Sequence, residues 1–77
     1  MIYEKLVGMI ADQLGVSEGK ITPKTRLKED LEADSASIMM LVMDVESEFN
    51  IEFEDDAIET IKTVEDVVRY IEGKQAK

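Results

Sequence analysis

The 77-residue chain contains neither histidine nor cysteine. Without histidine it lacks the commonest general base and metal ligand. Without cysteine it has no disulfide, thiolate ligand or thiol nucleophile. One proline and four glycines leave little room for a linker, and the length suits a single domain spanning residues 1–77. We therefore expect a protein that is not itself an enzyme, with no catalytic residues and no metal site.

Long apolar segments are missing as well. The longest fully apolar run covers residues 38–43, far short of the roughly 20 residues that span a bilayer. The first five residues, Met-Ile-Tyr-Glu-Lys, lack the basic stretch and apolar run of a secretory signal. We therefore expect a soluble, cytoplasmic protein that does not insert into membranes.

Aromatic residues are few, with two tyrosines, two phenylalanines and no tryptophan. Acidic chains poor in aromatics are often disordered. However, a hydrophobic share of 44% is ordinary for a folded domain, and the apolar residues recur with regular spacing. These two observations favour a folded chain.

The apolar spacing predicts two long helices. Apolar residues recur every three or four positions over 2–14 and again over 35–49, and Gly15 is placed to end the first helix. Residues 16–34 have no such period and contain Pro23, which predicts a long loop.

Two shorter helices follow. A short helix is expected over 56–61, and a further helix begins at Thr63, where Thr63 and Asp66 form a capping box. Gly73 is expected to end that helix. The predicted fold class is all-α, a small four-helix bundle with three main helices, one short third helix and a long loop between the first two.

Negative charge is concentrated in one part of the chain, whose net charge is −9. Twelve acids and no bases lie in residues 29–59, whereas six acids and all nine bases lie elsewhere. Four of the bases come directly before this block: Lys20, Lys24, Arg26 and Lys28. Such a block repels nucleic acid and anionic membranes and attracts basic protein surfaces. A solvated face that keeps the protein soluble is the plainer interpretation, but the regional segregation favours partner binding.

Two methionines of the second predicted helix project away from its core stripe. Met40 and Met43 are i, i+3 neighbours on the outer face, with Ala36 and Asp44 beside them. Isolated exposed apolar residues are normal, but flexible methionines suit surfaces that meet partners. We interpret this face as partner-binding and place Met39 at the flank of the core.

Ser35 stands at the start of the same helix, directly after Asp34, which is a suitable N-cap. The helix dipole and free backbone N–H groups there would favour a phosphate on the hydroxyl. A serine in this position is most often a helix-start residue and nothing more. It cannot be the nucleophile of a triad, because the chain has no histidine. From the spacing alone, a modification site and a plain helix start both remain open.

Residues 30–35, Asp-Leu-Glu-Ala-Asp-Ser, with the apolar-periodic helix that follows, resemble the acyl carrier proteins. The similarity continues through residues 46–51, 54–56 and 63–71 and includes the loop segment 20–25. It therefore covers essentially the whole chain. The Asp-Ser core is short, but its place at the start of an acidic helix makes the resemblance specific.

The resemblance implies a 4′-phosphopantetheine group from coenzyme A, joined to Ser35 by a phosphodiester and ending in a thiol that carries acyl groups as thioesters. Asp34 would belong to the motif read by a phosphopantetheinyl transferase. The other implied partners are acyl-transfer and chain-elongation enzymes with basic docking patches, in fatty acid or related specialised lipid or polyketide biosynthesis. We expect a monomer that binds no nucleic acid.

The residues expected to contact partner enzymes lie on the outer face of the second helix or near the third. They are Ala36, Met40, Met43, Asp44, Glu46, Glu48, Glu54, Asp55, Asp56 and Glu59. The residues expected to line a pocket for the acyl chain are apolar and face inward. They are Ile38, Val42, Phe49, Ile51, Ile58 and Ile61. Plain core packing is compatible with the second set and is the better supported interpretation from the residues.

Four residues depart from the family pattern. Ala36 stands where leucine is usual, Glu32 where glycine is common, and Ser37 and Met40 where acids are usual. The combination of Ala36, Ser37 and Met40 suggests a carrier for a restricted pathway. The main alternative function is an unmodified acidic helical adaptor that binds a basic protein. A calcium buffer is a weaker alternative, because residues 52–59 lack the spacing and the glycine of a calcium-binding loop.

Overall fold

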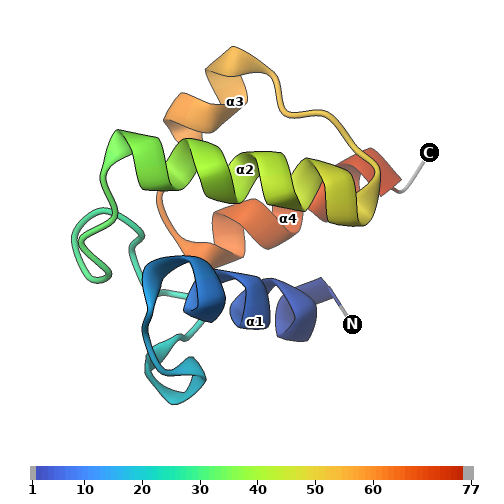
Figure 1. Ribbon diagram of the computed structural model, residues 1–77. Coiled ribbons are helices and arrows are strands. Elements are labelled where there is room, and N and C mark those ends of the chain that lie inside the picture. The colour runs from blue at the N-terminus through green and yellow to red at the C-terminus, as the bar shows by residue number, and fades with distance from the viewer. Residues whose placement is uncertain (1, 76–77) are drawn as a thin grey trace.

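The computed structural model describes residues 2–75, which form four α-helices and one short 3-10 helix. The helices are α1 (Ile2–Leu14), η1 (Glu18–Lys20), α2 (Ser35–Phe49), α3 (Asp55–Thr60) and α4 (Val64–Gln75). Figure 1 shows α1, α2 and α4 as the body of the bundle, with α3 on the side of α2 that faces away from α1. The predicted all-α fold, with its short third helix and long first loop, is confirmed.

The two long helices have the predicted bounds, and Gly15 ends α1 in the left-handed conformation, with φ of 67°. The prediction for Gly73 was wrong. Gly73 lies inside α4, which continues to Gln75, and it does not adopt the positive φ that lets a glycine end a helix. Within residues 2–75, no helix combines the length and the apolar character needed to cross a bilayer.

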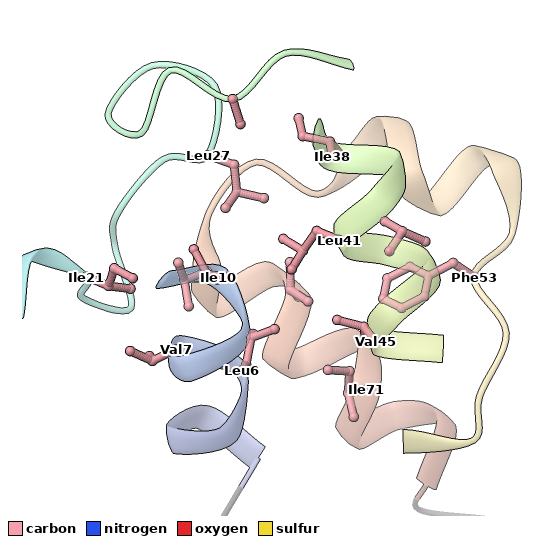
Figure 2. Packing of buried hydrophobic residues seen from close by; sticks show 14 residues of the cluster. Leu6, Val7, Ile10, Ile21, Leu27, Ile38, Leu41, Val45, Phe53 and Ile71 are labelled. Carbon is pink, nitrogen blue, oxygen red and sulfur yellow. The ribbon is translucent and has the colours of Figure 1, made fainter. Parts of the chain in front are cut away.

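The core is built from fourteen buried apolar side chains, most of them on α1, α2 and α4. Figure 2 shows Leu6, Leu41 and Ile71 among them, with Phe53 reaching in from the segment between α2 and α3. The Phe53 ring stacks on Tyr70 of α4 at 4.4 Å between centroids. By contrast, α3 contributes no buried residue. Few buried apolar contacts mean a low local stability, so α3 is the α-helix held least firmly.

The long loop is fastened to the segment that connects α3 and α4. The Leu27 N–H donates to the Lys62 carbonyl at 2.9 Å, and the Val64 N–H donates to the Thr25 carbonyl at 3.0 Å. Leu27 is only 1% exposed and belongs to the core. The irregular loop is thus anchored at both the backbone and the side-chain level, and this anchor sets where the chain enters α2.

The capping box that opens α4 is present as predicted. The Thr63 N–H donates to Asp66 Oδ2 at 3.2 Å, and the Asp66 N–H donates to Thr63 Oγ1 at 3.2 Å. The same Asp66 carboxylate accepts the Lys62 N–H at 3.0 Å, and these backbone hydrogen bonds lower its pKa. The start of α4 is therefore fixed next to the loop anchor.

Glu32 adopts a left-handed conformation, with φ of 56°, in the turn that leads into α2. The next residue, Ala33, is buried, and its N–H donates to the Leu27 carbonyl at 3.0 Å. This conformation costs a residue with a Cβ about 1–2 kcal/mol, whereas glycine adopts it freely. The common glycine of the family at this position is therefore explained by the backbone, and Glu32 carries strain in its place.

We expect Glu32→Gly to raise the free energy of unfolding by about 0.5–1 kcal/mol, because relief of the backbone strain exceeds the entropy that glycine gains in the unfolded chain. Glu32→Ala is the matched control, since it removes the same charge but keeps the Cβ. Urea unfolding followed by circular dichroism measures both variants. An equal gain in Glu32→Ala would show that charge repulsion, and not φ, is the cause.

Candidate functional site

Ser35 is the first residue of α2, and its side chain is exposed. Asp34 precedes it as the N-cap, in an extended conformation, and its Oδ1 accepts the Ser37 N–H at 2.8 Å. The Asp34 carbonyl accepts the Ile38 N–H at 3.0 Å. The predicted cap is confirmed, and it places the Ser35 hydroxyl at a fixed and accessible point on a rigid helix.

The Asp34 carboxylate has a lowered pKa. The main cause is the hydrogen bond from the Ser37 backbone N–H, and the Ser37 side chain contributes in the same direction. Hydrogen bonds to the charged form of an acid favour ionisation. A negative charge therefore stands beside Ser35 at neutral pH.

A hollow of about 220 Å³ opens next to Ser35, between the long loop, α2 and α3. Its lining residues are Lys28, Ser35, Ile38, Met39, Ile58 and Glu59. The volume lies below the roughly 300–1,000 Å³ of typical small-molecule pockets. A second hollow of about 180 Å³ shares Ile58 and Glu59 with the first and adds Ile61 to the lining. The two hollows follow the inner edge of the loosely held α3.

Only some of the predicted pocket residues meet at this place. Ile38 and Ile58 line the hollow beside Ser35, and Ile61 lines its neighbour. Val42 is packed in the core, at 4% exposure. The structure therefore brings three of the six predicted residues to the two hollows under α3.

Phe49 and Ile51 lie near the far end of α2, where they are half-buried and line separate depressions. A helix rises about 1.5 Å per residue, so Phe49 lies about 16 Å along the axis from Ile38. The six residues therefore do not form one cavity in this structure, because α2 carries them to opposite ends of the bundle.

Most of the predicted partner-binding acids are exposed. Glu48 pairs with Lys5 at 2.7 Å, Asp44 accepts a hydrogen bond from Gln13, and Glu54 lies 4.0 Å from Lys74. Asp55, Asp56 and Glu59 form no ion pair within residues 2–75. All three acids within α3 are thus uncompensated by an ion pair in this part of the chain.

Glu46 differs from the other predicted acids. It is half-buried, and its Oε2 accepts the Phe53 N–H at 2.7 Å, which fixes the segment between α2 and α3. Its carboxylate is thus directed toward its own chain. Across residues 2–75, no group of three or more acidic side chains is arranged to hold a metal ion.

Three methionines lie exposed on α2: Met39 at 45%, Met40 at 56% and Met43 at 62%. The exposure predicted for Met40 and Met43 is confirmed. The placement of Met39 at the core flank was wrong, because its neighbours Ile38 and Leu41 fill the core and α3 leaves the hollow beside Met39 open. Lys28 was not among the predicted site residues either, although it is the last base before the acidic block.

Comparison with known proteins defines the class. Residues 4–71 match the family model described as the phosphopantetheine attachment site. The chain is 45% identical over 73 residues to the acyl carrier protein of Thermotoga maritima, an alignment that covers 95% of this chain and 90% of the relative.

Two solved structures agree with this match, each 32% identical in sequence. An acyl carrier protein from Enterococcus faecalis, studied for its high thermal stability, superposes with a TM-score of 0.83 over 96% of this chain and 94% of its own. A structure assigned to an acyl carrier protein of Mycobacterium tuberculosis gives a TM-score of 0.84 over 90% and 92%. The chain belongs to the acyl carrier proteins.

The cofactor of this family is 4′-phosphopantetheine, whose thiol holds acyl groups as thioesters. The residues present fit such a group. Ser35 offers an exposed hydroxyl at the start of α2, and the hollow beside it contains the apolar side chains of Ile38 and Ile58 and the ammonium of Lys28. The protein is thus a carrier that works with partner enzymes.

The lowered pKa of Asp34 has a consequence for acid stability. Its ordinary value is 3.8 and the folded-state value lies below this, so its contribution is present above the unfolded-state pKa and is lost as the pH falls through the folded-state pKa. Asparagine caps a helix without titrating. We therefore expect Asp34→Asn to lose less stability than the unsubstituted protein between about pH 5 and pH 2.

Unfolding followed by circular dichroism across this pH range measures the difference between the two proteins. A carboxyl NMR titration of Asp34 gives the pKa directly. A folded-state pKa at or above that of the acid-unfolded chain would contradict the expectation.

Proposed function

We propose that Ser35 is the residue that carries the phosphopantetheine arm, and that Asp34 belongs to the site read by the transferase. The observation that supports this most directly is the position of the Ser35 hydroxyl, exposed at the first residue of α2 and held by the Asp34 cap. Ser37 is the nearest competing hydroxyl, but it is half-buried and its backbone N–H is committed to the cap.

The test is modification by a phosphopantetheinyl transferase with coenzyme A, read by intact mass. We expect the protein to gain one phosphopantetheine. Ser35→Ala abolishes the gain because the acceptor oxygen is gone, and Ser37→Ala keeps it as the matched control. Circular dichroism is recorded for both variants, and we expect both to remain folded.

An unmodified acidic adaptor would behave differently. It would gain no mass with any of several transferases, and its binding to a basic partner would be unchanged by Ser35→Ala. Either a gain retained in Ser35→Ala or the absence of any gain would overturn the assignment of Ser35.

We further propose a partner-docking face around the exposed methionines of α2. Met40 and Met43 form an apolar centre, and carboxylates surround it. The proposed face comprises Ala36, Met40, Met43, Asp44, Glu48, Glu54, Asp55, Asp56 and Glu59. Glu46 is left out, because its carboxylate accepts the Phe53 N–H. Charges at the rim steer a basic partner, and the apolar centre supplies contact area that excludes water.

The apolar centre also supports a specialised partner set. Ala36 is small, Ser37 is uncharged, and Met40 is 56% exposed at a position usually acidic in housekeeping carriers. A basic docking patch on a standard fatty acid synthase enzyme would therefore meet methyl and thioether groups where it otherwise meets a carboxylate. The basic patch therefore forms fewer ion pairs with this face. A partner enzyme whose docking patch has an apolar centre is favoured over one whose patch is entirely basic.

We expect Met40→Glu to lower the KM of a standard fatty acid synthase acyltransferase for this carrier by up to about fivefold, since one exposed ion pair contributes about 0.2–1 kcal/mol. The holo-protein is used, and kcat is measured alongside. Ser17→Glu is the control, because it adds the same charge at an exposed loop position away from α2 and α3. If the acyltransferase loads the wild-type protein as efficiently as it loads a housekeeping carrier, the specialised role is contradicted.

We also propose that the acyl chain enters through the hollow between α2 and α3. Ile38 and Ile58 supply its apolar walls, and Val42 lies in the core behind them. The hollow of about 220 Å³ is small, so a longer chain requires α3 to move outward. The absence of any buried residue on α3 supports this movement.

A further inference from the structure

Lys28 occupies a distinctive position beside the attachment region. It lines the hollow that contains Ser35 and also the adjoining hollow under α3, and Glu59 of α3 lines both as well. Its own side chain is exposed, and it forms no ion pair within residues 2–75. An uncommitted cation therefore stands at the mouth of the site.

Lys28 lies next to a region of concentrated negative charge. Residues 29–59 contain twelve acids and no base, and Ser35 lies within that stretch. A phosphodiester on Ser35 adds a further negative charge next to the ionised Asp34 carboxylate. Like charges at short range repel, and the repulsion is reduced when a cation is close by. Among residues 2–75, Lys28 is the only base that lines the hollow with Ser35.

Hydrogen bonds and burial of the neighbouring residues fix the backbone around Lys28, so the position from which its side chain extends is defined. Leu27 is buried and bonded to the Lys62 carbonyl. On the other side, the Asp30 carboxylate accepts the Arg26 N–H at 2.8 Å and pairs with the Arg26 guanidinium at 3.3 Å. The lysine side chain itself has a flexible four-carbon stem and an ammonium group with three hydrogen-bond donors. The stem can therefore move between two anions that share one hollow.

We propose that Lys28 binds the phosphodiester of the prosthetic group and holds the root of the arm at the mouth of the hollow between α2 and α3. The proposal rests on the attachment at Ser35 proposed above. In the unmodified protein, Glu59 of α3 is the anion available to Lys28 across the hollow. Modification of Ser35 adds a second anion to the hollow that Lys28 lines, and the ammonium then pairs with the phosphodiester in place of Glu59.

The experiment compares the melting temperatures of the apo- and holo-forms of the wild type, Lys28→Gln and Lys24→Gln. Lys24 is the matched control, an exposed lysine of the same loop that lines neither hollow. We expect the change in melting temperature on modification to be about 1–6 °C less favourable in Lys28→Gln than in the other two proteins. Lys28→Arg, which keeps the charge, is expected to restore the wild-type value.

A second readout follows the phosphorus atom itself. In the holo-protein, the ³¹P resonance of the phosphodiester is expected to shift in Lys28→Gln and to stay unchanged in Lys24→Gln. Added salt is expected to move the wild-type resonance toward its position in Lys28→Gln, because an exposed ion pair is screened.

Three outcomes would overturn the proposal. If Lys28→Gln changes the apo- and holo-forms equally, Lys28 acts on Glu59 or the fold and not on the phosphodiester. If the ³¹P resonance is the same in all variants, the ammonium does not contact the phosphate. Intact mass is recorded first for each protein. A chain that gains no phosphopantetheine contradicts the attachment at Ser35 as well as the role of Lys28. A modified chain whose melting temperature and ³¹P resonance do not depend on Lys28 contradicts the role of Lys28 alone.

Discussion

The entry of the chain into α2 depends on two backbone hydrogen bonds, from Leu27 to Lys62 and from Val64 to Thr25. They connect the irregular loop to the start of α4, and the Leu27 side chain is buried in the core beside them. The chain can then turn through the left-handed Glu32 and enter α2 at one defined place. Because Ser35 is the first residue of α2, the position of the proposed attachment residue depends on a contact between segments that are distant in the sequence.

The helices of the bundle differ in how firmly they are packed. Helices α1, α2 and α4 share the buried core, whereas α3 packs with partly buried side chains only. Carboxylates with no ion pair among residues 2–75 gather around α3, including Asp55 and Asp56. Their mutual repulsion and the thin packing both lower the cost of moving α3. The proposed attachment residue thus lies on a firmly packed helix, and the proposed entry for the acyl chain lies beside a loosely packed one.

Much of this could be predicted from residues close together in the sequence. The bounds of α1 and α2 follow from strong apolar periodicity and from local signals, namely Gly15 and the Asp34 cap. The failures concern residues whose surroundings come from elsewhere. Gly73 stays helical, and Met39 is exposed because the short α3 leaves it uncovered. Periodicity describes a single helix and contains no information about which neighbour covers it.

The sequence by itself determined the helices, the acidic block, the exposed pair of Met40 and Met43 and, through its resemblance to a family, the kind of cofactor, because each depends on local spacing or on residue identity. Only the tertiary structure decided which side chains share the hollow with Ser35. It separated Phe49 from Ile38 along α2 and brought Lys28 to the site. The reason is physical: a hollow is bounded by segments that are distant in the chain, and its members are chosen by the packing of loop, α2 and α3 and not by any local pattern.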